Sequence, residues 1–381
     1  RQIFTTWWPL AASWMLMGAE IPLLSAVMAR LVDPEIHLAA FGGVVFPLAL
    51  IIESPIIMLL AASTALSKDQ ASYALMRRFM MTAGALLTVL HFLVAFTPLY
   101  YVVAEKVIGI PPETIEPARL GLMIMLPWTW SIAYRRFHQG VLIRFGYSKA
   151  IGIGTMLRLS TVVLVLAAGY TLSRWFNIPG IAVGTAAQAA SVISEALYVH
   201  RVVRPVLNGE LKAAPPVDPP LSWQSFWAFY IPLVMTSLVT LIANPIGSAA
   251  VSRMPQALIS LAVWPVINGF VFMLRSLGIA YNEVVVALLD RPRASINLLH
   301  FARLLAGITT LALGFVAATP LSNLWFERLS ALSPPLAALA TTGLWLALPL
   351  PALSVIQSWY QGAILYGRRT RGITESVVVY L

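Results

Sequence analysis

Residues 264–289 read WPVINGFVFMLRSLGIAYNEVVVALL, an apolar stretch long enough to cross a bilayer as one helix. Arg275 lies near its middle, with Asn268 before it and Asn282 and Glu283 about two turns after it. A guanidinium at the centre of a membrane helix costs roughly 2.5–3.5 kcal/mol on insertion scales, so it must face a partner or a wet cavity. The stretch therefore predicts a membrane helix whose arginine has a specific task.

The composition of the whole chain is typical of a polytopic helical membrane protein. Of its 381 residues, 59% are hydrophobic and only 10% are charged, whereas soluble domains carry about 25% charged residues. Apolar runs recur along the chain, and an eleventh run begins near residue 373. The complete spans that we expect are 7–31, 38–65, 80–104, 117–143, 151–173, 179–203, 224–251, 257–289, 298–319 and 335–366.

Lysine and arginine are unevenly divided between the two sides of these spans. Cytoplasmic loops carry the excess of basic residues, so the more basic side, which includes the linker 204–223, should be cytoplasmic together with the N-terminus. We expect an integral protein of the plasma (inner) membrane. The net charge of +10 then reflects topology and predicts no nucleic-acid partner. The six basic residues of the odd loops and span ends are Arg30, Lys106, Arg119, Arg174, Arg253 and Arg328. The sixteen of the even loops and span ends are Lys68, Arg77, Arg78, Arg135, Arg136, Arg144, Lys149, Arg201, Arg204, Lys212, Arg291, Arg293, Arg303, Arg368, Arg369 and Arg371.

The two halves of the chain match when one is shifted by 222 or 223 residues. Each half then begins a set of six spans, an even number, so both halves have the same orientation and form parallel repeats. We expect twelve transmembrane helices in all, about ten of them complete here, with an N-terminal lobe over 1–203, a linker over 204–223 and a C-terminal lobe over 224–381. The matched pairs are Pro9 and Pro232, Pro22 and Pro245, Arg30 and Arg253, Ser54 and Ser276, Phe79 and Phe301, Pro127 and Pro349, and Phe137-His138-Gln139-Gly140 and Trp359-Tyr360-Gln361-Gly362.

Short motifs along these repeats resemble the multidrug/oligosaccharidyl-lipid/polysaccharide exporter superfamily, which includes the MATE transporters, and within it the progressive ankylosis family. The resemblance covers nearly the whole chain, and it implies an all-α MATE-like fold with a cleft between two lobes. The stretches that carry it are Gly18-Ala19-Glu20 with Arg30, His138-Gln139-Gly140-Val141-Leu142-Ile143, Pro232-Leu233, Asn244-Pro245-Ile246, Val251-Ser252-Arg253 and Trp264-Pro265-Val266.

The same resemblance implies a substrate class. Members of the progressive ankylosis family export anionic metabolites such as citrate, pyrophosphate and nucleotides. This chain departs from the family pattern at Asn244, where the family has an arginine, and so loses one potential anion contact. The resemblance implies a secondary transporter that exports small organic or phosphate-bearing anions by rocker-switch alternating access.

Polar residues inside the spans are the candidate site. Glu20 precedes Pro22 and Glu53 precedes Pro55, and a carboxylate beside a proline kink is a common proton or cation site. Arg275 and Glu53 differ by 222 residues, the repeat shift, so we hypothesise that they pair across the cleft in one conformation. The alternative is a permanent structural salt bridge. The remaining candidates are Asn244 and Asn268 as cavity-lining residues and Asn282 and Glu283 as a gate.

Other functions are left open or argued against by the residues. Arg275 favours an anion, whereas the two glutamates favour the alternative of an organic-cation exporter driven by protons or sodium. A second alternative is a flippase for lipid-linked saccharides or a scramblase-like protein. The sequence has no phosphate-binding loop, no nucleophile elbow and no cysteine, so we expect no enzyme, no metal and no cofactor beyond a coupling ion. We expect a monomer whose partners are the lipid bilayer and its substrate.

Overall fold

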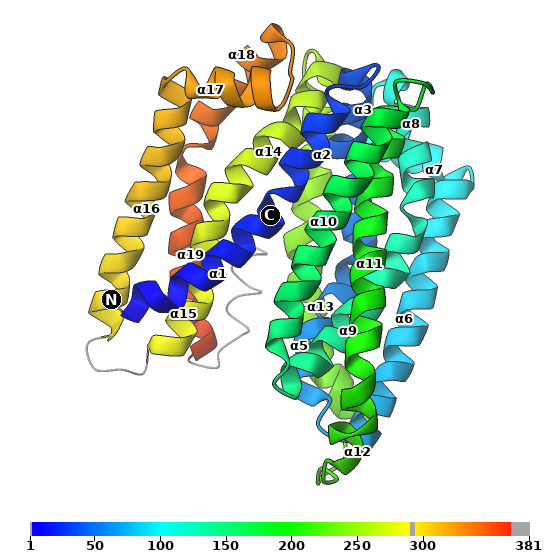
Figure 1. Ribbon diagram of the computed structural model, residues 1–381, viewed down its shortest axis with the longest axis vertical. Helices are drawn as coiled ribbons and strands as arrows, with labels where there is room; N and C mark the ends of the chain where they lie inside the picture. Colours follow the sequence, from blue (N-terminus) through cyan, green and yellow to red (C-terminus); the bar gives the residue numbers. More distant parts are fainter. Residues whose placement is uncertain (1, 290–293, 367–381) are drawn as a thin grey trace.

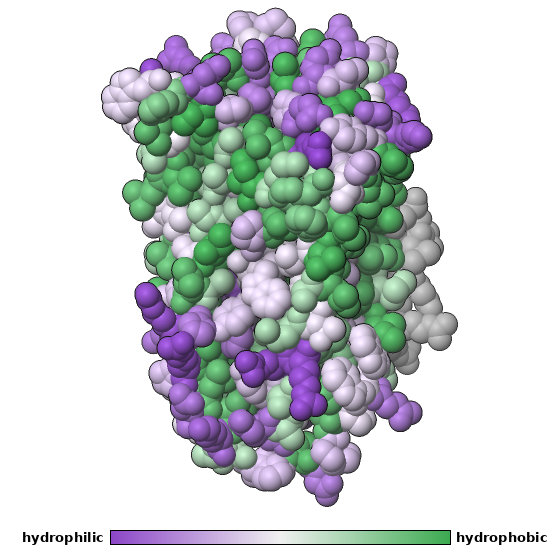
Figure 2. Space-filling model, turned by 90° about the vertical axis from the view of Figure 1, so that its right-hand side faces the viewer, coloured by the Kyte–Doolittle hydropathy of each residue, from purple (hydrophilic) through white to green (hydrophobic). Residues whose placement is uncertain are grey.

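The computed structural model describes residues 2–289 and 294–366, and the regular elements in these ranges are all helical (Figure 1). Nine helical segments within the described ranges are long and apolar enough to cross a membrane. Figure 2 shows apolar side chains over the middle of the molecule and hydrophilic side chains gathered toward its two ends. The chain is therefore an integral membrane protein, as its composition predicts.

The elements fall into an N-terminal half, 2–213, and a C-terminal half, 223–366. The N-terminal half contains α1 (Gln2–Gly18), α2 (Glu20–Met28), α3 (Pro34–Ala40), η1 (Phe41–Val45), α4 (Phe46–Ile57), α5 (Leu59–Leu66), α6 (Gln70–Phe96), α7 (Leu99–Tyr101), η2 (Val102–Ile108), α8 (Pro112–Ile124), α9 (Leu126–Arg144), α10 (Ser148–Leu172), α11 (Gly180–Asn208) and α12 (Glu210–Ala213). The C-terminal half contains α13 (Trp223–Val251), α14 (Ala257–Ile279), α15 (Tyr281–Leu288), α16 (Ala294–Ala318), α17 (Leu321–Asn323), η3 (Leu324–Leu329), α18 (Pro334–Ala347) and α19 (Pro349–Tyr366).

Nine of the ten expected spans coincide with these apolar segments, and two expectations need comment. The third span is Gln70–Phe96 rather than 80–104, because Asp69 caps the start of α6 and Thr97 and Pro98 end it. The fourth span, 117–143, is helical as α8 and α9, but it falls outside the nine apolar segments because arginines interrupt it. The eleventh span, near 373, lies outside the described residues.

The internal repeat appears in the backbone itself. Asp33 and Gln256, which differ by 223 residues, both adopt left-handed conformations just before α3 and α14. Gly109 and Ala331, which differ by 222, do the same after the π-helices η2 and η3. A left-handed conformation is uncommon outside glycine. Its recurrence at the repeat spacing confirms that the halves share one architecture.

The matched Gln-Gly steps make the same helix contact in both halves. A Cβ on Gly140 of α9 would lie 2.6 Å from the carbonyl oxygen of Leu60 in α5. A Cβ on Gly362 of α19 would lie 3.0 Å from the carbonyl oxygen of Asn282 in α15. Leu60 and Asn282 also differ by 222 residues. Glycine therefore permits the same close helix contact once in each half. The two glycines therefore have a scaffold role, since each lets two helix backbones approach closely.

The first helix of each half packs against the opposite half. α1 lies along α14, where the indole Nε1 of Trp7 donates to the carbonyl oxygen of Leu277 over 2.9 Å. α13 lies along α4, where the hydroxyl of Tyr230 donates to the carbonyl oxygen of Pro55 over 2.6 Å. In Figure 1, α1 leans toward α16. The two halves are thus interlocked, and the assignment of each half to one lobe stays a prediction.

The molecule has two distinct ends. The linker end carries the linker 214–222 and the turn 67–69, whereas the distal end carries the turns 29–33 and 252–256; they are at the bottom and the top of Figure 1. At the linker end, the Asp69 carboxylate accepts hydrogen bonds from the backbone N–H groups of Ser72, over 2.8 Å, and Val217, over 2.9 Å. Burial disfavours the charge, but these hydrogen bonds outweigh burial and lower the pKa of Asp69.

Gly140→Ala should destabilise the fold by about 1–3 kcal/mol, because its Cβ would lie 2.5 Å from the Cβ of Ser63. Gly152→Ala in α10 is the matched control, since no atom lies within 4 Å of its added Cβ. Alanine is favoured over glycine in a helix by about 1 kcal/mol, so the control should be neutral or stabilising. Thermal unfolding in detergent measures both, and equal melting temperatures would contradict the close contact.

Asp69→Asn should release the linker at neutral pH, since an amide accepts these hydrogen bonds less strongly than a carboxylate. Hydrogen exchange of segment 214–222 should accelerate about fivefold, as expected for a loss of about 1 kcal/mol. In the wild-type chain the protection should be complete above about pH 4, the ordinary carboxyl range, and lost as pH falls through the lowered pKa. Asp218→Asn, an exposed change in the same linker, is the control, and it should leave exchange unchanged.

Candidate functional site

Glu20 begins α2, directly after the break in the first transmembrane span at Ala19. Its side chain is buried, with 4% of its surface exposed. The Arg158 guanidinium of α10 forms an ion pair with it through two nitrogens, with Nε donating to Oε1 over 3.2 Å and Nη2 donating to Oε2. The Ser191 hydroxyl of α11 donates to Oε1 over 3.3 Å. Glu20 therefore joins three helices through a neutralised charge.

A second buried ion pair joins α9 to α11. Arg135 of α9 donates to Oε2 of Glu195 in α11, and the amide of Gln139 donates to Oε1 of the same carboxylate over 2.8 Å. Gly154 of α10 makes room for this group, because a Cβ there would lie 3.2 Å from Glu195 Oε1. Gln139, from the repeated Gln-Gly step, therefore also donates to a carboxylate of an ion pair. Its counterpart in α19, Gln361, is instead within 3.5 Å of the amide of Asn282.

Glu53 lies deeper in the same half, on α4, with 1% of its surface exposed. Thr129 faces its carboxyl group, and Arg135 and Arg136 are the nearest charges that act on it. The hydroxyl of Thr129 is also 2.8 Å from Nδ1 of His91, which is buried. Glu53 Oε1 and the Nε atoms of both arginines have no hydrogen-bond partner among the described residues.

The N-terminal half thus contains a balanced set of buried and half-buried charges. Glu20, Glu53 and Glu195 face three guanidinium groups, and the charges cancel if every group is ionised. Removing one partner from such a set is costly, since it leaves an uncompensated charge in a low-dielectric interior. The arginines of this set are Arg135, Arg136 and Arg158.

Arg275 belongs to a separate group in the C-terminal half. It is half-buried on α14, and its Nε donates to the hydroxyl of Ser354 in α19 over 2.8 Å. Asn282 repeats this contact seven residues later, with its amide 3.5 Å from Oε1 of Gln361. In this conformation Glu53 and Arg275 are each engaged within their own half, so the pairing hypothesised from the repeat stays a prediction for another state.

The other predicted site residues are more exposed. Asn244 is exposed on α13, and its amide donates to the carbonyl oxygen of Leu241 in its own helix over 3.3 Å. Asn268 is exposed on α14. Glu283 is exposed on α15, where Trp14 of α1 contacts its carboxyl group. The contacts of Asn244 and Glu283 are thus with residues other than Glu20 and Glu53.

Sequence reasoning missed the partners of the buried glutamates. The sequence places Arg135 and Arg136 at the cytoplasmic end of a span, whereas in the structure Arg135 is buried and Arg136 half-buried beside carboxylates. Without them the more basic side still holds fourteen lysines and arginines against six, so the asymmetry survives. The available signal was spacing: Arg135 and Gln139, like Ser191 and Glu195, lie four residues apart and therefore share a helix face.

The sequence and the fold were compared with those of known proteins. No model of a protein family and no curated protein sequence matches the chain. The structure resembles an inward-facing multidrug resistance MATE family transporter of the MOP superfamily, with a TM-score of 0.71 and 14% identity over 95% of this chain and 84% of that one. The protein has the MATE fold.

Two further solved structures have the same fold. The eukaryotic MATE transporter AtDTX14 aligns with a TM-score of 0.63 and 12% identity over 97% of this chain and 84% of its own. A MATE protein in complex with MaL6 aligns with a TM-score of 0.58 and 16% identity over 99% of this chain and 86% of its own. The MATE-like architecture predicted from the repeats is confirmed, while the likeness to the progressive ankylosis branch stays a prediction.

Metal ligands are not gathered in the part of the chain that the structure describes. Across 2–289 and 294–366, no three side chains of His, Asp or Glu lie together as a metal site would require. The charged groups of the MATE fold here are instead arranged as arginine–carboxylate pairs. Such pairs hold helices together and can exchange partners.

Arg158→Leu should lower the free energy of unfolding by about 3–5 kcal/mol, because Glu20 would remain buried without its partner. The double variant Glu20→Leu with Arg158→Leu should recover most of that loss, since it removes both charges. Denaturant titration in detergent measures each variant. Arg174→Ala, an exposed arginine at the end of α10, is the control, and a loss in Arg158→Leu no larger than in the control would contradict a buried pair.

Proposed function

We propose that the protein is a secondary active transporter that exports small organic or phosphate-bearing anions by alternating access. The MATE fold supports transport rather than catalysis, since the solved MATE structures named above are of transport proteins. The observation that favours an anion is the ion pair between Glu20 and Arg158. A carboxylate neutralised by an arginine has little attraction left for a cationic substrate or a coupling ion.

Arg275 is the proposed anion contact. Its guanidinium is half-buried on α14, a helix that packs against α1 and α2 as well as against α19. A guanidinium binds carboxylate and phosphate groups through two parallel hydrogen bonds, a geometry that an ammonium group does not offer. Arg275 could therefore receive a citrate, a pyrophosphate or a nucleotide phosphate. Asn244 and Asn268 are proposed to line the route, and Asn282 and Glu283 to form its gate.

The conformation and topology are part of the same proposal. We infer that the molecule is open toward the linker end, which the similarity to an inward-facing MATE transporter supports. The excess of lysine and arginine at the linker end supports a cytoplasmic N-terminus in a plasma (inner) membrane. A proton or sodium gradient is the proposed source of energy, and the monomer is the proposed transporting unit.

Export of organic cations is the second candidate. The observation that favours it is Glu283, an exposed carboxylate on α15 that Trp14 contacts. An acidic group beside an aromatic ring is a suitable binding site for an organic cation. Anion export depends on Arg275 and cation export on Glu283, so one transport assay with variants of both residues separates the two candidates.

Arg275→Ala should reduce anion efflux from proteoliposomes about 10- to 150-fold, as expected for the loss of a charged hydrogen bond worth about 1.5–3 kcal/mol. Citrate, pyrophosphate and ATP are the test substrates, each with and without a proton or sodium gradient. Arg275→Lys should retain part of the activity, because it keeps the charge but loses the fork geometry.

The control for Arg275 is Arg303→Ala, an exposed arginine on α16. Equal efflux in Arg275→Ala and Arg303→Ala would contradict the anion site. Efflux of a cationic dye that is lost in Glu283→Gln and kept in Arg275→Ala would instead establish the second candidate.

A further inference from the structure

Arg30 follows the end of α2 at the distal end of the molecule and reaches into the opposite half. Its Nη1 donates to the carbonyl oxygen of Leu329 over 2.9 Å, and its Nη2 donates to that of Arg328 over 2.7 Å. These carbonyls end the π-helix η3. Carbonyl groups at the end of a helix lack partners within the helix, and a cation there is also favoured by the helix dipole.

Arg253 follows the end of α13 and does the same in the reverse direction. Its Nη1 donates to the carbonyl oxygen of Ile108 and its Nη2 to that of Val107, each over 3.1 Å. These carbonyls end the π-helix η2 in the N-terminal half. The neighbouring hydroxyl of Ser252 adds a third bond to Ile108, over 2.6 Å. Each half therefore caps a helix of the other.

The two arginines are held in the same way by their own helices. Nη1 of Arg30 donates to the carbonyl oxygen of Ala26, and Nη1 of Arg253 donates to that of Ala249, each over 2.6 Å. Both acceptors lie four residues before the arginine. This local bond aims the guanidinium across the boundary between the halves, so its reach does not depend on a freely moving side chain.

The receiving segments are also related by the repeat. The Glu105-Lys106 pair of η2 and the Glu327-Arg328 pair of η3 differ by 222 residues, as do the left-handed residues that follow each helix. Arg30 and Arg253 differ by 223. The same pair of donor and acceptor segments therefore makes contact in both copies of the repeat. An accidental surface contact would not be expected to occur twice.

We propose that Arg30 and Arg253 form a reciprocal clasp that closes the distal end in this conformation and must release before that end can open. Each cap joins a helix end of one half to a π-helix of the other, so a movement that draws these segments apart at the distal end breaks both arginine caps. The proposal concerns the closed distal end alone and requires neither a particular substrate nor Arg275. It therefore stands or fails separately from the proposed function.

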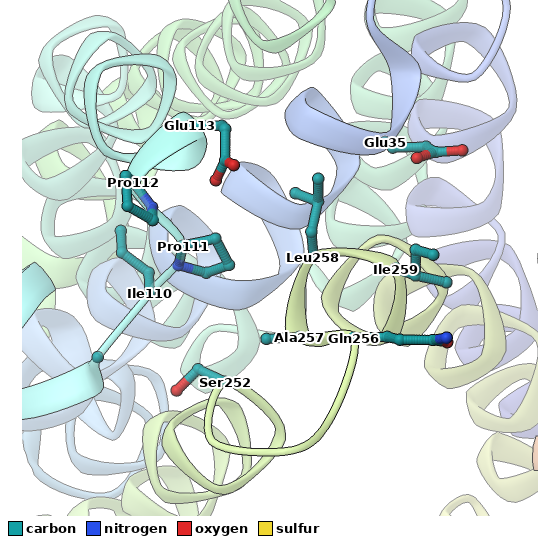
Figure 3. Close-up of a pocket in the computed structure, with 11 residues that line it drawn as sticks. Glu35, Ile110, Pro111, Pro112, Glu113, Ser252, Gln256, Ala257, Leu258 and Ile259 are labelled. Carbon is teal, nitrogen blue, oxygen red and sulfur yellow. The ribbon is translucent and has the colours of Figure 1, made fainter.

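Solvent reaches one side of this clasp. A cavity of about 560 Å³ lies along the boundary between the halves, lined by segment 109–113 of the N-terminal half and by Ser252 and segment 256–259 of the C-terminal half. Figure 3 shows segment 110–113 on one side of the cavity and the start of α14 on the other. Both arginines are exposed, so salt should weaken their bonds.

Distance measurements between spin labels test the clasp. The chain contains no cysteine, so labels can be introduced in pairs, at Glu105→Cys with Met254→Cys and at Val32→Cys with Glu327→Cys. All four positions are exposed at the distal end. Double electron–electron resonance in lipid nanodiscs then reports the populations of short and long distances for each clasp. The wild-type background should give mainly short distances.

Arg30→Ala with Arg253→Ala should increase the long-distance population at least threefold for both label pairs, and each single variant should increase it less. Arg253→Lys should be intermediate, because an ammonium group on a flexible stem does not reproduce the guanidinium fork that spans two carbonyls. Arg174→Ala is the control, an exposed arginine at the distal end that stacks on Tyr170 of its own helix. Unchanged distances in the double variant, or an equal increase in the control, would overturn the proposal.

Salt provides a second measurement on the chain without any arginine change. Raising NaCl from about 0.05 M to about 1 M shortens the Debye length from roughly 14 Å to roughly 3 Å. The long-distance population should rise with salt for both label pairs and should not rise further in the double variant. Unchanged wild-type distances at high salt would show that the clasp does not hold the distal end. This test remains valid even if an arginine variant fails to fold.

Discussion

A charge inside a bilayer is tolerated only beside a compensating group, and this constraint shapes the N-terminal half of the protein. Glu20, Glu195 and Glu53 lie on α2, α11 and α4, and the arginines that face them come from α9 and α10. Each pair ties helices that are far apart in the chain. Lipid tails supply no hydrophobic force between helices, so these charged contacts and the small residues beside them define how the helices pack.

The two halves are interlocked through their first helices. α1 packs against α14 and α13 against α4, so each half gives its first helix to the other. The caps made by Arg30 and Arg253 extend this exchange to the distal end. An architecture built from two equal copies can therefore change shape only if matched contacts in both copies change together, which is a natural basis for a two-state movement.

The charge arrangement is the basis for proposing an anionic substrate rather than a cationic one. A membrane carboxylate such as Glu20 invites a cation only while its charge is unbalanced, and Arg158 balances it. Arg275 lies elsewhere, on a helix that touches both α1 and α19, with the neutral hydroxyl of Ser354 at its Nε. Glu20, Glu53 and Glu195 are buried in the packed interior, whereas Arg275 lies on a half-buried helix face, and this difference is why we propose an anionic substrate.

Much of the fold could be predicted from residues alone, because hydropathy and internal repetition are properties of local sequence. The spans and the parallel repeat followed from run lengths and from a shift of 222 or 223 residues, and the same shift relates Gly140 to Gly362. The third span was misplaced by about ten residues, since the apolar run continues past Thr97 while the helix ends there. A capping aspartate and a proline decide such ends more sharply than hydropathy does.

The site was harder to predict, because a partner is chosen by packing and not by distance along the chain. Glu20, Glu53 and Arg275 were recognisable as costly residues in apolar helices, and the repeat suggested that two of them pair. The helices instead bring Arg158 to Glu20, across 138 residues, and Arg135 to Glu195. The sequence by itself determined that Glu20, Glu53 and Arg275 lie within apolar helices and that the architecture repeats. Only the tertiary structure decided which charges meet, since pairing requires two helix faces to be turned toward each other at the same depth.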